Sequence, residues 1–181
     1  MFRRQGTNTM AMTALLAAAL AALAPAAIPI GPVPITLAVF VICIFPYISG
    51  AKPTVLGVVV YLVIGAMGLP VFSGYEGGVQ KLVGPTGGYL IGYIPLAAIG
   101  GFFVQRSEKR LMHIIGFAAA LVVLYVFGTA WLCFHLKLDL ASALKAAVLP
   151  FIPFDLAKTL LAALIGPIIK KRVAAARTRP S

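Results

Sequence analysis

Charged residues are scarce in this chain. Only 10% of its 181 residues are Asp, Glu, Lys or Arg, and only four of these are acidic, whereas 61% belong to the hydrophobic set. An average soluble domain has about 25% charged residues, so this composition excludes an ordinary water-soluble protein. With a mean hydropathy of +1.04, the chain is expected to be an integral membrane protein.

Cysteine and histidine are also rare. Cys43 and Cys133 lie in apolar runs without a C-x-x-C spacing or a nearby His, so neither zinc nor redox chemistry is indicated and both are expected to be small core residues. His113 and His135 lie near the ends of apolar segments, where surface or interfacial roles are expected. Paired carboxylates, a metal cluster and a nucleophile–base spacing are all missing, which disfavours an enzyme. We expect no cofactor.

Basic residues exceed acidic ones by fifteen to four, giving a net charge of +11. In a soluble chain this excess would indicate nucleic acid, but in a membrane protein it marks the cytoplasmic side. We therefore expect the lipid bilayer, and no nucleic acid, as a partner.

Apolar runs separated by glycine, proline or charge predict six transmembrane helices in one bundle, an all-α integral membrane protein. The whole chain, residues 1–181, is expected to form a single membrane domain. The predicted helices cover residues 10–28, 36–50, 54–69, 86–105, 111–134 and 153–171. A weakly amphipathic linker helix is expected within residues 135–148.

The first apolar run allows two interpretations. Its basic start and small residues near Ala24–Ala27 are typical of a cleaved signal peptide. Alternatively it is a retained first helix, in which Ala14, Ala18 and Ala22 form a small-xxx-small face that lets another helix approach closely. The same alanines are also compatible with a merely alanine-rich segment.

Three connections carry strong turn signals. The uncharged IGPVPITL, residues 30–37 after Pro29, contains prolines that exclude regular helix and favour an extended connection. Residues 50–53, GAKP, are expected to form a turn. Residues 69–84 form the longest stretch without a helical pattern, and its apolar and aromatic residues indicate an ordered, Gly-rich cap rather than disorder.

The distribution of basic residues predicts the orientation. With six spans, eleven basic residues fall on the side that holds both termini, and three fall on the other side. The positive-inside rule then places both termini in the cytoplasm and residues 69–84 outside. The eleven are Arg3, Arg4, Lys52, Arg106, Lys109, Arg110, Lys170, Lys171, Arg172, Arg177 and Arg179; the three are Lys81, Lys137 and Lys145.

The stretch PFIPFDLAKTLLAALIG, residues 150–166, contains a pair of oppositely charged residues inside a predicted span. Asp155 and Lys158 are three residues apart, so they stand on one face of a helix and can pair. Ionisable groups in a membrane segment cost roughly 2.5 kcal/mol or more each and usually mark a site. A purely structural pair that neutralises itself near the membrane interface is the alternative. Because the Pro-rich connection and the Gly-rich cap converge on the same face, we expect a small-molecule pocket there.

Four of these segments resemble the BioY family, the biotin-binding substrate-specific (S) components of energy-coupling-factor (ECF) vitamin transporters. The resemblance is carried, in order, by PITL (34–37), GLPVFSG (68–74), GPTGGYLIG (84–92) and PFIPFDLAK (150–158). It implies biotin uptake across a bacterial cytoplasmic membrane by a six-helix subunit. It also implies partners on other chains, namely a coupling membrane protein and a pair of ATPases. If such a coupling protein exists, the small-residue face of Ala14, Ala18 and Ala22 is predicted to contact it.

The resemblance also implies site residues. Asp155 and Lys158 match the positions that contact biotin in that family, and the cap and the GGY motif that enclose it map onto Phe72, Ser73, Gly74 and Tyr89. Thr36 of PITL is a further substrate-binding candidate. The chain departs from the family pattern at Ala38, Phe154, Tyr75 and Glu76, the first two of which could reshape the pocket wall.

The chemistry of biotin fits these residues. A carboxylate can accept a ureido N–H, an ammonium can donate to the ureido carbonyl, and aromatic faces can cover the rings. The alternatives are an S component for another small vitamin, a membrane enzyme and a structural or assembly subunit.

Overall fold

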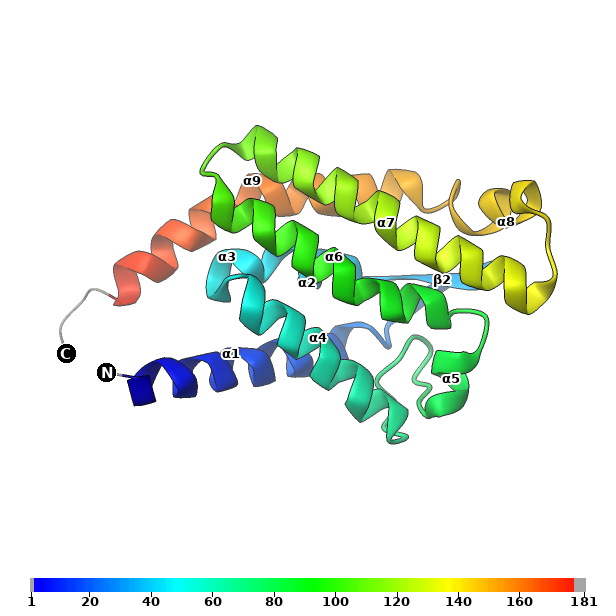
Figure 1. The fold of residues 1–181 in the computed structure, drawn as a ribbon, viewed down its shortest axis with the longest axis horizontal. Coiled ribbons are helices and arrows are strands. Elements are labelled where there is room, and N and C mark those ends of the chain that lie inside the picture. Colours follow the sequence, from blue (N-terminus) through cyan, green and yellow to red (C-terminus); the bar gives the residue numbers. More distant parts are fainter. Residues whose placement is uncertain (1, 178–181) are drawn as a thin grey trace.

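The computed structural model describes residues 2–177, with side chains described for residues 7–176. Within that range the chain is a helical bundle with one small β-hairpin (Figure 1). The elements are α1 (Phe2–Leu23), β1 (Ala27–Ile30), β2 (Val33–Thr36), α2 (Ala38–Ile44), α3 (Pro46–Ser49), α4 (Ala51–Ala66), α5 (Val79–Val83), α6 (Gly87–Arg106), α7 (Arg110–Leu136), α8 (Leu140–Ala147) and α9 (Ile152–Arg177).

Three helices, α6, α7 and α9, are long and apolar enough to cross a membrane, whereas residues 7–23, 38–49 and 51–66 form shorter apolar helices. The outer faces of the long helices are apolar as well. Phe134 is 81% exposed and Val126 is 61% exposed, both on α7. Such surfaces are unfavourable in water and suited to lipid. The fold is therefore that of a membrane protein.

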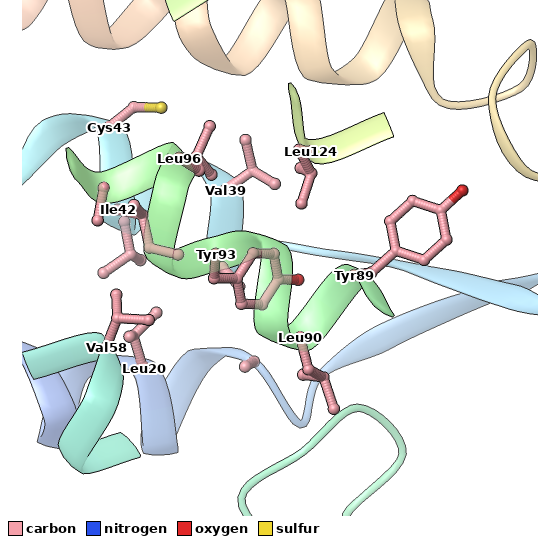
Figure 2. Packing of buried hydrophobic residues seen from close by; sticks show 14 of the residues in the cluster. Leu20, Val39, Ile42, Cys43, Val58, Tyr89, Leu90, Tyr93, Leu96 and Leu124 are labelled. Carbon is pink, nitrogen blue, oxygen red and sulfur yellow. The ribbon is translucent and has the colours of Figure 1, made fainter. Parts of the chain in front are cut away.

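The core gathers around α6, which packs along α7 on one side and α4 on the other. Figure 2 shows buried side chains from α1, α2, α4 and α7 turned toward α6. Cys43 belongs to this core, as expected, and Cys133 is partly buried. Burial of this apolar surface between helices holds the tyrosines of α6 in fixed positions.

The extended connection predicted around residues 30–37 is a β-hairpin, which the all-α prediction omitted. Its two-residue loop begins with Gly31, whose φ of +66° is suited to the first position of a type II′ turn. Pro29 and Pro34 lie opposite each other, one pair beyond the residues that flank the loop. Hydrogen-bonded and non-hydrogen-bonded pairs alternate in an antiparallel ladder, so the two prolines fall where no N–H is needed.

Several predicted boundaries were wrong. The segment predicted as helix 36–50 is divided at Phe45 into α2 and α3, with Pro46 in the first turn of α3. Lys52 and Pro53, predicted in a turn, lie in the first turn of α4, where a proline costs no hydrogen bond. The stretch 69–84 contains the short helix α5. Helix α1 ends at Leu23, before the predicted residue 28, and α9 continues past the predicted residue 171.

Helix α1 begins at the same end of the bundle at which α9 ends. Figure 1 shows the start of α1, the α3–α4 connection, the α6–α7 connection and the end of α9 at one end of the bundle, hereafter the terminal end. The hairpin, α5 and α8 lie at the opposite, hairpin end. The segments predicted to share a side therefore share an end. Arg179 lies outside the described residues, and the side chains of Arg3, Arg4 and Arg177 are not described either.

His113, expected to have a surface or interfacial role, is buried at the terminal end. Its Nε2 lies 2.8 Å from the Ser107 carbonyl oxygen, and its Nδ1 lies 2.9 Å from the Tyr47 hydroxyl. Because a carbonyl oxygen can only accept, Nε2 carries the proton, and in the neutral ring Tyr47 donates to Nδ1. The imidazole thus ties α3 to the start of α7 and has a structural role.

Candidate functional site

A narrow cavity lies at the hairpin end, between β2 and helices α2, α6, α7 and α9. Its water-accessible space is only about 30 Å³, so the cavity is nearly closed in this structure. Apolar and aromatic side chains form most of its wall, with one carboxylate and one ammonium among them, as is typical of small-molecule sites. The lining residues are Val33, Pro34, Ile35, Thr36, Val39, Tyr89, Tyr93, Leu124, Tyr125, Phe151, Asp155 and Lys158.

Asp155 reaches this cavity from the first turn of α9 and is 4% exposed. Its Oδ1 accepts a hydrogen bond from Lys158 Nζ at 3.0 Å, and its Oδ2 accepts one from the Tyr125 hydroxyl at 2.9 Å. The start of α9 is held by the Asp155 backbone N–H, which donates to the Phe151 carbonyl at 2.8 Å. The carboxylate is therefore fixed by groups on two helices.

The pair retains hydrogen-bonding capacity. A carboxylate has about four acceptor sites and an ammonium has three donors. Within residues 7–176, Asp155 accepts two side-chain hydrogen bonds, and Lys158 uses one donor on Asp155. Both residues line the cavity, so their remaining acceptors and donors can meet a polar ligand there. A pair serving only to neutralise itself would not need to face a cavity.

Tyr89 and Tyr93 cover the cavity from α6. They are four residues apart and so lie on one face of the helix, and Figure 2 shows both rings beside Leu124 of α7. The Tyr89 hydroxyl donates to the Ala147 carbonyl at the end of α8, at 2.9 Å. Its ring passes over Gly128 of α7, where any Cβ would overlap it. The hydrogen bond of its hydroxyl and the contact of its ring with Gly128 therefore both hold Tyr89 in place.

Thr36 lies where the hairpin turns into α2. Its Oγ1 accepts a hydrogen bond from the Ala38 N–H at 3.2 Å, and its side chain lines the cavity. A second cavity, of about 20 Å³, shares Thr36, Tyr89 and Tyr93 with the first and reaches Ser73 in the cap. Gly74 lines neither of these two cavities; it lines a groove beside the hairpin instead.

Phe72 lies elsewhere. It is fully buried and lines none of these cavities. Its ring packs edge-on against the ring of Tyr61, with 5.5 Å between the two ring centroids. Backbone hydrogen bonds tie the same loop down, including Gly74 N–H to the Pro25 carbonyl at 3.0 Å. On the far side of the cap, Trp131 Nε1 donates to the Gly84 carbonyl at 2.8 Å. In this structure, therefore, Phe72 anchors the cap, and Ser73 is the cap residue that lines the second cavity.

Sequence reasoning missed two functional candidates, Tyr93 of α6 and Tyr125 of α7. Tyr125 lies within an otherwise apolar span, and a hydroxyl there needs a partner. This need for a hydrogen-bond partner was the sequence signal that could have identified Tyr125. Phe154, a departure from the family pattern, is 47% exposed and lines no cavity described here, whereas Ala38 is fully buried beneath the hairpin. Among the described residues, no group of three or more His, Cys, Asp or Glu could hold a metal ion.

Comparisons with known proteins agree with one another. The model of the BioY family matches residues 1–175. The biotin transporter BioY of Thermotoga maritima is 42% identical over 144 residues, covering 80% of this chain and 85% of that protein. The biotin transporter BioY2 of Lactococcus lactis subsp. cremoris is 33% identical over 169 residues, covering 90% and 91%. The crystal structure of the S-component for biotin from an ECF-type ABC transporter superposes with a TM-score of 0.85 at 29% identity, covering 94% of this chain and 95% of that one.

Proposed function

The chain belongs to the BioY family, and from this membership we propose that it binds biotin at the hairpin end as the substrate-binding subunit of a biotin uptake system. As a member of a transporter family it is a transport protein and not an enzyme. Biotin is its transported substrate, and the chain needs no cofactor.

One observation carries the proposed site. A carboxylate that is 4% exposed, Asp155, lies in the wall of an apolar cavity and accepts from Lys158 and Tyr125. The cost of burying such a pair in an apolar wall is offset when a ligand uses its free donors and acceptors. Asp155 then accepts a ureido N–H, and Lys158 donates to the ureido carbonyl. Tyr89 and Tyr93 cover the apolar sulfur ring.

Thr36 and Ser73 support the ligand from the hairpin and the cap. The Thr36 side chain lines the first two cavities, between which the tyrosines of α6 stand. Ser73 approaches from the cap. In this proposal Gly74 shapes the entrance, and Phe72 acts indirectly by keeping the cap closed over the pocket.

We further propose that the chain is one membrane domain with six spans. Helix α1, the broken helix α2–α3, and helices α4, α6, α7 and α9 are the spans, while α5 and α8 lie at the membrane surface. The domain is inserted in the cytoplasmic membrane. The eleven-to-three distribution of basic residues supports an orientation in which the terminal end faces the cytoplasm. The Gly-rich cap then faces outward, where it can receive biotin.

The chain carries no nucleotide-binding motif of the G-x-x-x-x-G-K-S/T kind. We therefore propose that a coupling membrane protein and ATPase subunits, supplied by other chains, drive uptake. The face of α1 formed by Ala14, Ala18 and Ala22 is exposed on the bundle and is available for such a contact.

Titration of labelled biotin onto the purified chain in detergent tests the function. We expect saturable binding that unlabelled biotin displaces and thiamine does not, and a large loss of binding in Asp155→Asn. Equal displacement by thiamine, or no saturable binding to a folded wild-type protein, would contradict the proposal.

A further inference from the structure

A third groove extends the row of cavities beyond the proposed ring site. It is an open groove of about 280 Å³ beside the hairpin and is lined by Pro34, Ser73, Glu76 and Lys81, among others. Pro34 lines all three cavities, and Ser73 lines the second and third. The three therefore form one row under the hairpin and cap, with Asp155 and Lys158 at its inner end and Lys81 at its mouth.

The charges at the mouth are unequally buried. Lys81 Nζ lies 2.8 Å from Glu76 Oε2, but the Lys81 side chain is only 18% exposed while that of Glu76 is 58% exposed. Their hydrogen bond is exposed, so the ion pair is weak and the Glu76 carboxylate returns to water at little cost. Lys81 is therefore a site for an anion whose present partner can be replaced.

We propose that Lys81 binds the carboxylate at the end of the ligand's tail, which takes the place of Glu76. This inference rests on the proposed function. Biotin carries its polar ureido ring at one end and a flexible chain ending in a carboxylate at the other. The row offers a buried Asp155–Lys158 pair at one end and a single cation at the other. The ligand thus lies along the row, with its ring inward and its acid at the mouth.

This orientation gives Lys81 a role in specificity. An amide or ester of biotin keeps the ring but has no anion for Lys81 to pair with. The chain then selects free biotin over biotin in amide linkage. Other basic residues of the hairpin end, Lys137 and Lys145, are exposed and line none of the described cavities. Lys145 therefore provides a matched control of equal charge.

Competition binding with biotin and biotinamide tests the proposal. In Lys81→Met we expect biotin affinity to fall about tenfold and biotinamide affinity to change less than about twofold. Lys81→Arg keeps the preference for the acid, and Lys145→Met keeps both affinities. Glu76→Gln removes the competing carboxylate, so biotin should bind about threefold more tightly, with biotinamide unchanged.

The ratio of the two affinities decides the outcome, because a loss of folding weakens both ligands alike. An unchanged ratio in Lys81→Met and Glu76→Gln would overturn the role of Lys81 and leave the proposed function intact. Failure of folded wild-type protein to bind either ligand would instead overturn the proposed function, and the tail assignment with it. Melting temperatures without ligand identify any variant that has lost its fold.

Discussion

At the scale of single residues, substitutions of Asp155 and Lys158 can distinguish a ligand-binding pair from a purely structural ion pair. A buried ion pair adds little net stability by itself, yet removing one partner leaves a lone buried charge that is strongly destabilising. A ligand site and a structural pair therefore differ in how single and double substitutions combine. Tyr125 adds a third group to this cluster through its hydrogen bond to Asp155.

We predict that Asp155→Asn and Lys158→Met each weaken biotin binding about tenfold to a hundredfold, because each loses a charge-assisted hydrogen bond of about 1.5 to 3 kcal/mol. Each should also lower the melting temperature. The double variant should recover part of the stability, since no lone charge remains, but should not recover binding.

The measurement is the melting temperature of all four proteins with and without biotin. Lys171→Met, which removes an exposed charge from the other end of α9, is the control. A double variant that kept the full biotin-dependent shift would show that the pair is structural and that the site lies elsewhere.

The sequence predicted this pair but not its full surroundings. Helical spacing and the scarcity of charge identify Asp155 and Lys158, because both arguments are local. Tyr125 lies 30 residues before Asp155, and its pairing depends on how α7 packs on α9. The burial of His113 has the same cause, since its partner Tyr47 comes from α3. Contacts between distant helices do not follow from a pattern read along one helix.

At the scale of elements, the hairpin and the cap position the pocket. Prolines correctly predicted that residues 30–37 are not helical. They also argue against strands, and only the register, which pairs Pro29 with Pro34, removes that objection. Strand pairing is set by the Gly31 turn and by packing over α2, so the hairpin was missed while its extended backbone was predicted.

We predict that Phe72→Ala loosens the cap. The ring of Phe72 is fully buried against Tyr61 and beneath Gly65. Truncating a buried Phe to Ala costs about 3 to 5 kcal/mol, and this loss should fall on the cap and α4 first. Biotin should therefore dissociate faster, with a smaller change in its association rate.

Stopped-flow dissociation of a fluorescent biotin derivative from the purified variant measures this effect. Val79→Ala, at an exposed position of α5, is the control and should dissociate at the wild-type rate. An unchanged dissociation rate in folded Phe72→Ala would mean that the backbone hydrogen bonds of Gly74 and Gly78 hold the cap without the ring.

At the scale of the whole molecule, the distribution of charge predicts orientation. Lys52 in the first turn of α4, Lys109 before α7 and Lys170 in the last part of α9 belong to elements that meet at the terminal end, whereas Lys81 belongs to α5 at the hairpin end. In cells, a cysteine at Ser73 should react with a membrane-impermeant maleimide added outside, and a cysteine at Ser107 should react only after lysis. The native cysteines are first replaced by alanine so that only the introduced thiol reports. Labelling of Ser107 but not Ser73 in intact cells would reverse both the topology and the proposed entry side.

The same scale includes assembly with other chains. Ala14, Ala18 and Ala22 recur every fourth residue on α1 and are exposed, whereas Leu16 and Leu20 of the same helix are fully buried. Helix α1 thus packs on α4 with its leucine side and leaves its small residues facing outward. A face of small residues allows close backbone contact with a partner helix in the membrane.

We predict that Ala18→Trp lowers biotin uptake and the co-purification of coupling subunits, while biotin binding by the isolated chain stays unchanged. Val126→Trp, which enlarges an exposed apolar position on α7, is the control. If Ala18→Trp weakened binding by the isolated chain as much as uptake, the face would pack within the protein rather than against a partner.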